Sequence, residues 1–330
     1  MAHGGTDPRT DTEFGLLLDP AKRGMRVIVH GGAGADPDES ADRQAVLERA
    51  AASGAEEGSP TDSVVAAVSV LEESPRFNAG VGGAIQSDGV VRTDAGIMTE
   101  AGAVGGACSM AGVCDALSVA RQVMEGTPHV LLSGAQARTF ADAQGIATDV
   151  GLLTEETRDQ WADLDPPAIE NYTEHLAWVT DRFGDDSDDG TESGGAGTRS
   201  HDTVGAVAVG DGAEDGSDRE IAAATSTGGR WCALAGRVGD VPQVGSGFFC
   251  SPAGGASATG AGEDIARTTL SRRAVDLLEQ GNTPREAAES AIEHFGERTN
   301  SEAGVIVAAR DGATGSAYNS AAMQVSVAEL

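Results

Sequence analysis

The spacing of apolar residues predicts helices along much of the first half of the chain. Helices are expected over residues 41–57, 61–73, 115–125 and 134–143. In the second of these, Val64, Val68 and Leu71 recur at the spacing that places them on one helical face. Thr61 or Asp62 can cap the start of this helix through its side-chain oxygen.

Runs of small and β-branched residues predict the strands. Residues 27–29, Val-Ile-Val, form a short buried strand that leads into a glycine loop over 30–34. Further strands are expected at 203–209, 220–226 and 303–309. Two more helices lie near the C-terminus, and the second opens with a capping box, Thr283 to Glu286, with proline at its first helical position. Strands in both halves with helices between them predict an α/β or α+β sandwich.

This pattern breaks at two segments that are almost wholly polar. Residues 184–200 hold one alanine as their only apolar residue and many like charges, which is typical of a mobile acidic linker. Residues 1–24 are polar, and their one apolar run, Phe14–Leu18, is shorter than the signal-peptide core of about 7–15 residues. We therefore expect an N-terminal extension over 1–24 and a cytoplasmic protein.

The formal net charge of −30 limits the partners that the protein can have. A surface this acidic repels nucleic acid and anionic membranes, and no run approaches the roughly 18 apolar residues of a membrane span. Lys22 is the only lysine in the chain. Acidic residues spread over the whole sequence, with so little lysine, resemble proteins from salt-saturated cytoplasm, where dense salt screens self-repulsion. We expect a small-molecule substrate and no nucleic-acid or membrane partner.

Glycine motifs and cysteines do not carry the chemistry. The first glycine loop reads Gly32-Ala-Gly34, but Pro37 stands where a dinucleotide-binding motif needs its third glycine. The sequence also lacks the common phosphate-loop, zinc-peptidase, serine-hydrolase and calcium-loop motifs. The cysteines lack metal-binding spacing and are expected to be buried, unreactive thiols: Cys108, Cys114, Cys232 and Cys250.

Five segments carry the candidate chemistry. They are Phe77–Gly80, His201–Val207, Thr225–Gly229, Gly236–Asp240 and Ser257–Glu263. Their order and spacing resemble the plant-type asparaginase and isoaspartyl peptidase family of N-terminal-nucleophile hydrolases, from about residue 25 to the C-terminus with an interruption at the linker. This resemblance implies an α+β fold, the four-layer αββα sandwich of the N-terminal-nucleophile hydrolases.

The resemblance also implies that the chain cuts itself between Asp202 and Thr203. Cleavage would give an α subunit of residues 25–202 and a β subunit of residues 203–330 that remain one intertwined domain. A threonine hydroxyl needs a base to take its proton, and the α-amine freed by cleavage, with an ordinary pKa of about 8, can act as that base. Thr203 is therefore the expected nucleophile.

Other site residues follow by resemblance. The hydroxyl of Thr227 would orient Thr203, and Asn78 would brace the site. Arg237 and Asp240 would anchor the α-carboxylate and α-ammonium of the substrate, because an arginine fork matches a carboxylate and an aspartate matches an ammonium group.

The developing negative charge of the reaction needs hydrogen-bond donors. By resemblance, the Thr259 hydroxyl and the Gly260 backbone N–H form this oxyanion hole. Gly229 and Gly262 would leave room for the leaving group. His30 is expected to be a structural residue of the first glycine loop.

A loop after the second helix resembles the sodium-binding loop of the family. Its backbone oxygens would form a cage for a hard cation, from Leu71, Glu72, Ser74, Phe77, Ala79 and Val81. This ion would be structural, and no cofactor is required for the chemistry. The resemblance also suggests a dimer of cleaved α/β pairs.

The expected activity is hydrolysis of the side-chain amide of L-asparagine or of β-aspartyl dipeptides, which releases L-aspartate. A glycosylasparaginase and a catalytically silent binding module on the same fold remain alternatives. After Gly229 the family continues with methionine, a polar pair and lysine, whereas this chain reads Arg-Trp-Cys-Ala-Leu-Ala over 230–235. Val241 and Ala261 also depart from the family pattern. These departures bear on the choice of substrate more than on the core chemistry.

Overall fold

The computed structural model describes residues 24–37, 39–183, 203–211 and 219–330. Its helices are α1 Ser40–Ala55, α2 Pro60–Glu72, α3 Ala116–Gly126, α4 Gly134–Ala143, α5 Glu155–Ala162, α6 Tyr172–Phe183, α7 Gly262–Thr268, α8 Leu270–Glu279 and α9 Pro284–Arg298. Its strands are β1 Arg26–Gly34, β2 Arg92–Thr99, β3 Val104–Ala111, β4 Leu131–Ser133, β5 Val204–Asp211, β6 Arg219–Thr227, β7 Phe248–Ser251, β8 Gly254–Gly260, β9 Ala303–Ala309, β10 Thr314–Tyr318 and β11 Ala322–Glu329.

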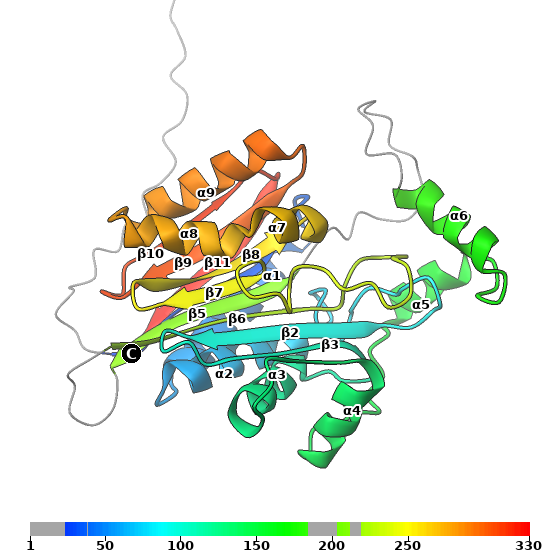
Figure 1. The fold of residues 1–330 in the computed structure, drawn as a ribbon, viewed down its shortest axis with the longest axis horizontal. Coiled ribbons are helices and arrows are strands. Elements are labelled where there is room, and N and C mark those ends of the chain that lie inside the picture. The colour runs from blue at the N-terminus through cyan, green and yellow to red at the C-terminus, as the bar shows by residue number, and fades with distance from the viewer. Residues whose placement is uncertain (1–23, 38, 184–202, 212–218) are drawn as a thin grey trace, which may run out of the picture.

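Two sheets stack face to face between two layers of helices (Figure 1). Within the described residues, the larger sheet has the order β11-β1-β5-β6-β2-β3-β4 and the smaller has the order β10-β9-β8-β7. Helices α1, α2 and α3 pack against the larger sheet, and α8 and α9 pack against the smaller one. This arrangement is the predicted four-layer αββα sandwich, and it confirms the α+β fold.

The inner strands are buried on both faces, and their residues alternate between two apolar cores. On β1, Val27 and Val29 pack with Leu47 of α1 in the core under the first helices. Ile28, between them, packs with Val207 in the core between the two sheets. Because both faces of such a strand are covered, its sequence is apolar throughout rather than alternating.

Most of the predicted elements are confirmed. The four predicted N-terminal helices correspond to α1, α2, α3 and α4, and the runs at 203–209, 220–226 and 303–309 correspond to β5, β6 and β9. The Thr283–Glu286 capping box is formed at the start of α9. The acidic linker at 184–200 and all but the last residue of the 1–24 extension lie outside the described residues.

Two local predictions are wrong. The expected cap of α2 at Thr61 or Asp62 is provided instead by Ser59, whose hydroxyl accepts a hydrogen bond of 3.1 Å from the Asp62 backbone N–H. Pro60 occupies the first helical position, so the helix begins one residue earlier than predicted and Ser59 directly before it is the cap. The expected glycine loop at 30–34 is a continuation of β1, with an irregularity in its pairing to β11 between His30 and Ala33.

The cysteines are all free thiols. Cys108, Cys232 and Cys250 are buried as predicted, whereas Cys114 is partly exposed, contrary to the prediction. Burial raises the pKa of Cys114 to about 11, so this thiol is also held in its unreactive protonated form. Among the helices of the described residues, none has the length and apolar character needed to cross a bilayer.

Candidate active site

Two threonine hydroxyls meet at the end of the central strand pair. Thr203 directly precedes β5, and Thr227 is the last residue of β6, which pairs antiparallel with β5. The Thr203 hydroxyl donates a hydrogen bond of 3.2 Å to Oγ1 of Thr227. Both residues are buried, with 6% and 4% of their surfaces exposed. A hydroxyl pair in a site with little access to water is a suitable starting arrangement for a nucleophile.

The register between the two sheets brings Thr259 toward the same point. Residues of β5 and β6 face β8 across the space between the sheets at every second position. Val207 and Ala223 face Gly255. Gly205 and Thr225 face Ser257. Two residues further along each strand, the same register places Thr259 opposite Thr203 and Thr227. Gly260 follows with a φ of 134°, and a side chain there would collide with the Glu302 carbonyl oxygen, so only glycine suits the position.

Asn78 fixes the turn that follows Thr227. Its Nδ2 donates a hydrogen bond of 2.6 Å to the Gly229 carbonyl oxygen, and its Oδ1 accepts one of 2.8 Å from the Ala84 backbone N–H. The Gly229 backbone N–H in turn donates to Oγ1 of Thr227 at 3.1 Å. Gly229 has a φ of 89°, a conformation that a residue with a side chain rarely adopts. The turn therefore holds the Thr227 hydroxyl in place.

Arg237 and Asp240 lie together, as the spacing of their segment requires, and a third charged residue joins them. Glu263, at the start of α7, accepts hydrogen bonds from Nε and Nη2 of Arg237, both of 2.8 Å. Gly262 packs against this pair so closely that a Cβ atom there would lie 2.7 Å from Oδ1 of Asp240 and 2.9 Å from Nη2 of Arg237. Arg237 and Asp240 can therefore take these positions only because residue 262 has no side chain.

The carboxyl groups of this cluster have opposite pKa shifts. Burial raises the pKa of Asp240 to about 7, although the charge of Arg237 opposes the shift. Burial also disfavours ionisation of Glu263, but the hydrogen bonds and charge of Arg237 outweigh it and lower the pKa of Glu263 to about 2. Oδ2 of Asp240 is buried and has no hydrogen-bond partner within the described part of the chain. A ligand cation can satisfy this buried oxygen.

Asp94 is a further buried carboxyl that the sequence analysis missed. It lies on β2 directly opposite Thr227 and accepts a hydrogen bond of 2.7 Å from the Ser109 backbone N–H. Burial raises its pKa to about 7. Its electrostatic interaction with Arg237 shows that it lies close to the charged cluster. With so many acidic residues in the chain, nothing in the sequence singles it out.

The loop that carries Arg237 is held by side chains from the segment before β2. Gln86 accepts a hydrogen bond of 2.8 Å from the Gly236 backbone N–H and donates one of 3.0 Å to the Arg237 carbonyl oxygen. Ser87 accepts one of 3.0 Å from the Ala235 backbone N–H. His175 of α6 contacts the same Ser87 hydroxyl at 2.8 Å. These contacts also escaped the sequence analysis, because they join segments far apart in the chain.

His30 lies behind the site in a chain of polar contacts between the sheets. Its Nε2 lies 2.9 Å from the Ser257 hydroxyl, which lies 2.7 Å from the Thr225 hydroxyl. Thr225 donates to the Gly247 carbonyl oxygen, so it must accept from Ser257, and Ser257 must accept from a protonated Nε2 of His30. Burial lowers the pKa of His30 to about 3, which keeps the ring neutral, as a structural role requires.

The loop after α2 can suit a cation. Gly80 and Gly82 have φ values of 55° and 90°. A side chain on Gly80 would collide with the Glu72 carbonyl oxygen, and one on Gly82 would collide with the carbonyl oxygens of Pro75 and Phe77. Carbonyl oxygens gathered around side-chain-free positions fit a hard cation, which prefers oxygen ligands. These oxygens are of the ligand type that the expected sodium ion needs, and both the ion and its ligands remain predictions.

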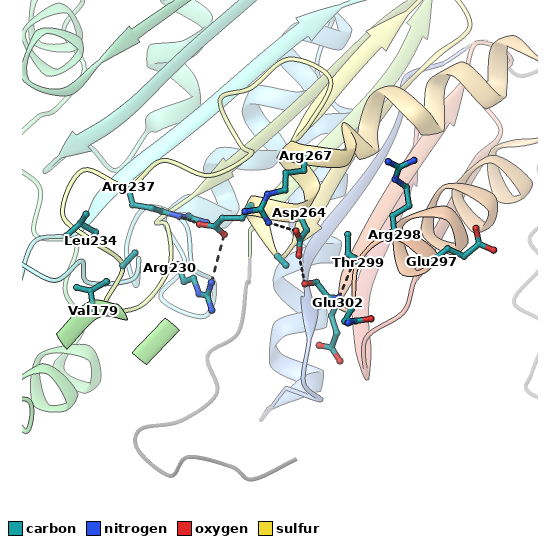
Figure 2. A pocket seen from close by; sticks show the side chains of 15 residues that line it. Val179, Arg230, Leu234, Arg237, Asp264, Arg267, Glu297, Arg298, Thr299 and Glu302 are labelled. Atoms are coloured by element: carbon teal, nitrogen blue, oxygen red, sulfur yellow. Dashed lines mark hydrogen bonds and ion pairs between the residues drawn. The ribbon is translucent and has the colours of Figure 1, made fainter. Parts of the chain in front are cut away.

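A cavity of about 840 Å³ opens beside the charged cluster. Figure 2 shows Arg230, Leu234 and Arg237 on one side of it and Thr299 and Glu302 on the other. Glu263 and Ala261 also line it. The two sides come from the loop after β6 and from the chain between α9 and β9.

Stacked sheets between helical layers, with a buried threonine directly before a central strand, define the class of N-terminal-nucleophile hydrolases. A family model described as Asparaginase matches residues 23–329, so this chain belongs to the asparaginase family.

Similar proteins support this assignment. The chain is 38% identical to the plant-type L-asparaginase of Pyrococcus abyssi over 307 residues, which cover 89% of this chain and 93% of that protein. It is 40% identical to the plant-type L-asparaginase of Pyrobaculum calidifontis over 307 residues, which cover 90% and 94% of the two chains. It is 35% identical to the isoaspartyl peptidase/L-asparaginase of Danio rerio over 313 residues, 92% of each chain.

Proposed function

We propose that the protein hydrolyses the side-chain amide of L-asparagine, the β-aspartyl bond of isoaspartyl dipeptides, or both, and releases L-aspartate, with Thr203 as the nucleophile. The observation that carries this proposal is the buried hydroxyl pair of Thr203 and Thr227 at the head of β5. The names of the relatives support the substrate class. They do not favour a glycosylasparaginase, and a complete set of site residues speaks against a silent binding module.

The proposed reaction begins with cleavage of the peptide bond between Asp202 and Thr203. The new α-amine of Thr203 takes the proton of its own hydroxyl, directly or through one water. Oγ1 of Thr203 then attacks the side-chain carbonyl carbon of the substrate, and the carbonyl oxygen becomes negatively charged. The Thr259 hydroxyl and the Gly260 backbone N–H would stabilise this charge. Thr227, which accepts the Thr203 hydrogen bond in this structure, would keep Oγ1 aimed at the carbon.

The intermediate then collapses, and the proton held by the α-amine passes to the departing nitrogen. Ammonia leaves from asparagine, or an amino acid leaves from a β-aspartyl dipeptide, and an ester joins aspartate to Thr203. Water attacks this ester through the same base and oxyanion site, which releases L-aspartate and restores Thr203. The steps balance with water as the only co-reactant.

The aspartyl head group would be held by the charged cluster. Arg237 would bind the α-carboxylate, and Asp240 would bind the α-ammonium group. The buried Oδ2 of Asp240 lacks a partner within the described residues, and a substrate ammonium would supply one. Gly229 and Gly262 would leave space for the substrate. A sodium ion in the loop after α2 would stabilise the position of Asn78 and take no part in the chemistry.

The proposal also includes a cytoplasmic location and a dimer of cleaved α/β pairs. The test is a kinetic comparison of purified wild-type protein with Thr203→Ala. Ammonia release from L-asparagine and aspartate release from β-aspartyl-alanine are measured separately. We expect at least one activity in the wild type and neither in the variant. Equal turnover by both proteins would contradict the assignment of the nucleophile.

A further inference from the structure

The cavity beside the charged cluster is larger than asparagine requires. At about 840 Å³ it lies toward the upper end of the range, about 300–1,000 Å³, of pockets that enclose drug-sized ligands. The aspartyl head group would occupy only the end near Arg237. The remainder is lined by Arg230, Val179 of α6 and the segment around Thr299 (Figure 2). The shape of the site therefore leaves space for a second amino acid.

Arg230 stands where the leaving group of such a substrate would go. It follows Gly229 directly and lies three residues after Thr227, which contacts the nucleophile. Three residues of chain can span about 10 Å at most. The side chain is 33% exposed and lines the cavity, so its guanidinium group is within reach of a bound ligand.

Arg230 shares the carboxylate of Glu263 with Arg237. Oε2 of Glu263 lies 3.9 Å from Nη1 of Arg230, but both oxygens of Glu263 already accept hydrogen bonds from Arg237 at 2.8 Å. One carboxylate thus lies between two guanidinium groups. Arg267, which also lines the cavity, pairs with Asp264 at 2.7 Å. Arg230 therefore brings a positive charge to this end of the cavity, beside the guanidinium group of Arg237.

We propose that Arg230 binds the C-terminal carboxylate of the amino acid that leaves from a β-aspartyl dipeptide. This inference rests on the proposed function and assigns the leaving-group subsite to one residue. With the head group on Arg237 and the scissile carbonyl at Thr203, the leaving residue extends into the cavity and brings its carboxylate to Arg230. Asparagine releases ammonia, which carries no carboxylate and makes no such contact. Arg230 therefore favours dipeptides over asparagine.

The test compares three substrates: β-aspartyl-alanine, the C-terminal amide of the same dipeptide, and L-asparagine. The variants are Arg230→Met, which keeps an unbranched apolar side chain, and Arg267→Met, which removes a charge from another residue that lines the cavity. In Arg230→Met we expect the ratio of kcat/KM for the dipeptide to kcat/KM for asparagine to fall about 10- to 100-fold, the effect of losing a charge-assisted hydrogen bond. In the wild type, amidation of the dipeptide should produce a loss of similar size.

The control variant Arg267→Met should keep the wild-type ratio. An unchanged ratio in Arg230→Met, an equal fall in Arg267→Met, or an amide cleaved as well as the free acid would each overturn the inference. If the wild type hydrolyses asparagine but not the dipeptide, the inference fails and the proposed function stands. If the wild type hydrolyses neither substrate, the proposed function fails with it.

Discussion

Arg237 and Glu263 form a side-on pair in which Nε and Nη2 of the guanidinium each donate to one carboxylate oxygen at 2.8 Å. This pair uses one edge of the guanidinium group and fixes its plane. The N–H groups on the other edge, at Nη1 and Nη2, can donate to a second carboxylate. Glu263 is therefore a positioning residue for the proposed substrate anchor.

Arg237→Lys should lose most of the hydrolytic activity. A lysine ammonium cannot make parallel hydrogen bonds to Glu263 and to a substrate carboxylate. We expect kcat/KM for asparagine to fall roughly 10- to 150-fold, which corresponds to about 1.5–3 kcal/mol for one charge-assisted hydrogen bond. Cleavage before Thr203 should change less, because it needs no amino-acid head group.

Glu263→Gln provides the matched control for this prediction. It keeps one acceptor oxygen for Arg237 but removes the charge, so we expect a higher KM with a smaller change in kcat. A variant of Arg237 that hydrolyses asparagine at the wild-type kcat/KM would refute the anchoring role. Loss of both activities together with loss of the folded circular dichroism spectrum would mean that Arg237 is structural.

Mature protein should consist of two chains, one that ends at Asp202 and one that begins at Thr203. The reason is that the base proposed for Thr203 is its own α-amine, which exists only after cleavage. Denaturing gel electrophoresis and intact mass spectrometry measure this directly. Thr203→Ala should stay uncut, and a fully active wild type that remains one chain of 33.2 kDa would rule out the mechanism.

Thr227→Val should reduce kcat much more than Thr227→Ser. Valine has the shape of threonine but leaves the Thr203 hydroxyl and the Gly229 backbone N–H without their partner. An unsatisfied buried polar group costs about 1–3 kcal/mol, so we expect a loss of roughly 5- to 150-fold. Serine retains the hydroxyl and should recover most of the rate. Equal activity of the two variants would exclude an orienting role for this hydroxyl.

The activity should rise with pH through about 7. Burial, with the nearby charges of Glu263 and Asp94, raises the pKa of Asp240 to about 7, and only its ionised form can bind an ammonium group. The acid limb of kcat/KM reports the pKa of such a group in the free enzyme. Because the charge of Asp94 raises the pKa of Asp240, Asp94→Asn should move this limb to lower pH. If the acid limb of kcat/KM in Asp94→Asn stays at the wild-type pH, Asp240 is not the group whose ionisation controls it.

The same pKa shifts predict a decrease in stability over this pH range. Asp94 and Asp240 ordinarily titrate with a pKa of 3.8, but in the folded protein their pKa values are raised to about 7. Between these values the folded state binds more protons than the unfolded state, so the free energy of unfolding falls as pH rises. The melting temperature of Asp94→Asn should therefore decline less over this range than that of the wild type.

Salt should stabilise the folded protein. A net charge of −30 produces self-repulsion that ions screen over about 8 Å at physiological ionic strength and about 3 Å at 1 M. We expect the melting temperature to rise from about 0.1 M to about 1 M potassium chloride. The same measurement with an uncharged osmolyte separates the screening of charges from the stabilisation that arises when a cosolvent is excluded from the protein surface. A melting temperature that does not depend on salt would contradict the interpretation of the composition.

The sequence predicted the elements whose apolar residues are periodic or β-branched. Helix α4 was expected at its observed bounds, and β9 was expected from an unbroken apolar run. Strands β2 and β3 were missed because they are rich in glycine, alanine and polar residues. A side chain on Gly96 would occupy the space of Phe248, and one on Gly105 would collide with α3. Close packing between layers, rather than strand propensity, selects such residues.

The residues of the candidate site also fall into a group that the sequence predicts and a group that it does not. Thr203, Thr227, Arg237 and Asp240 belong to segments whose order can be recognised along the chain. Glu263, Gln86 and Asp94 could not be singled out, because an acidic or amide side chain has no signature until folding brings it to its partner. Gln86 reaches Arg237 across 151 positions, a contact that no local pattern encodes.

The position of β5 determines how the two chains of a cleaved enzyme would depend on each other. β5 lies between β1 and β6 in the larger sheet, so the first strand of the second chain is bonded along one edge to the first chain. β11, from the same second chain, pairs with the other edge of β1. Cleavage would leave this interlaced sheet intact, but its refolding would become a second-order reaction between two polypeptides. The uncut precursor is then the only form that can reach the fold alone, and the lifetime of the mature enzyme is set by its rate of unfolding.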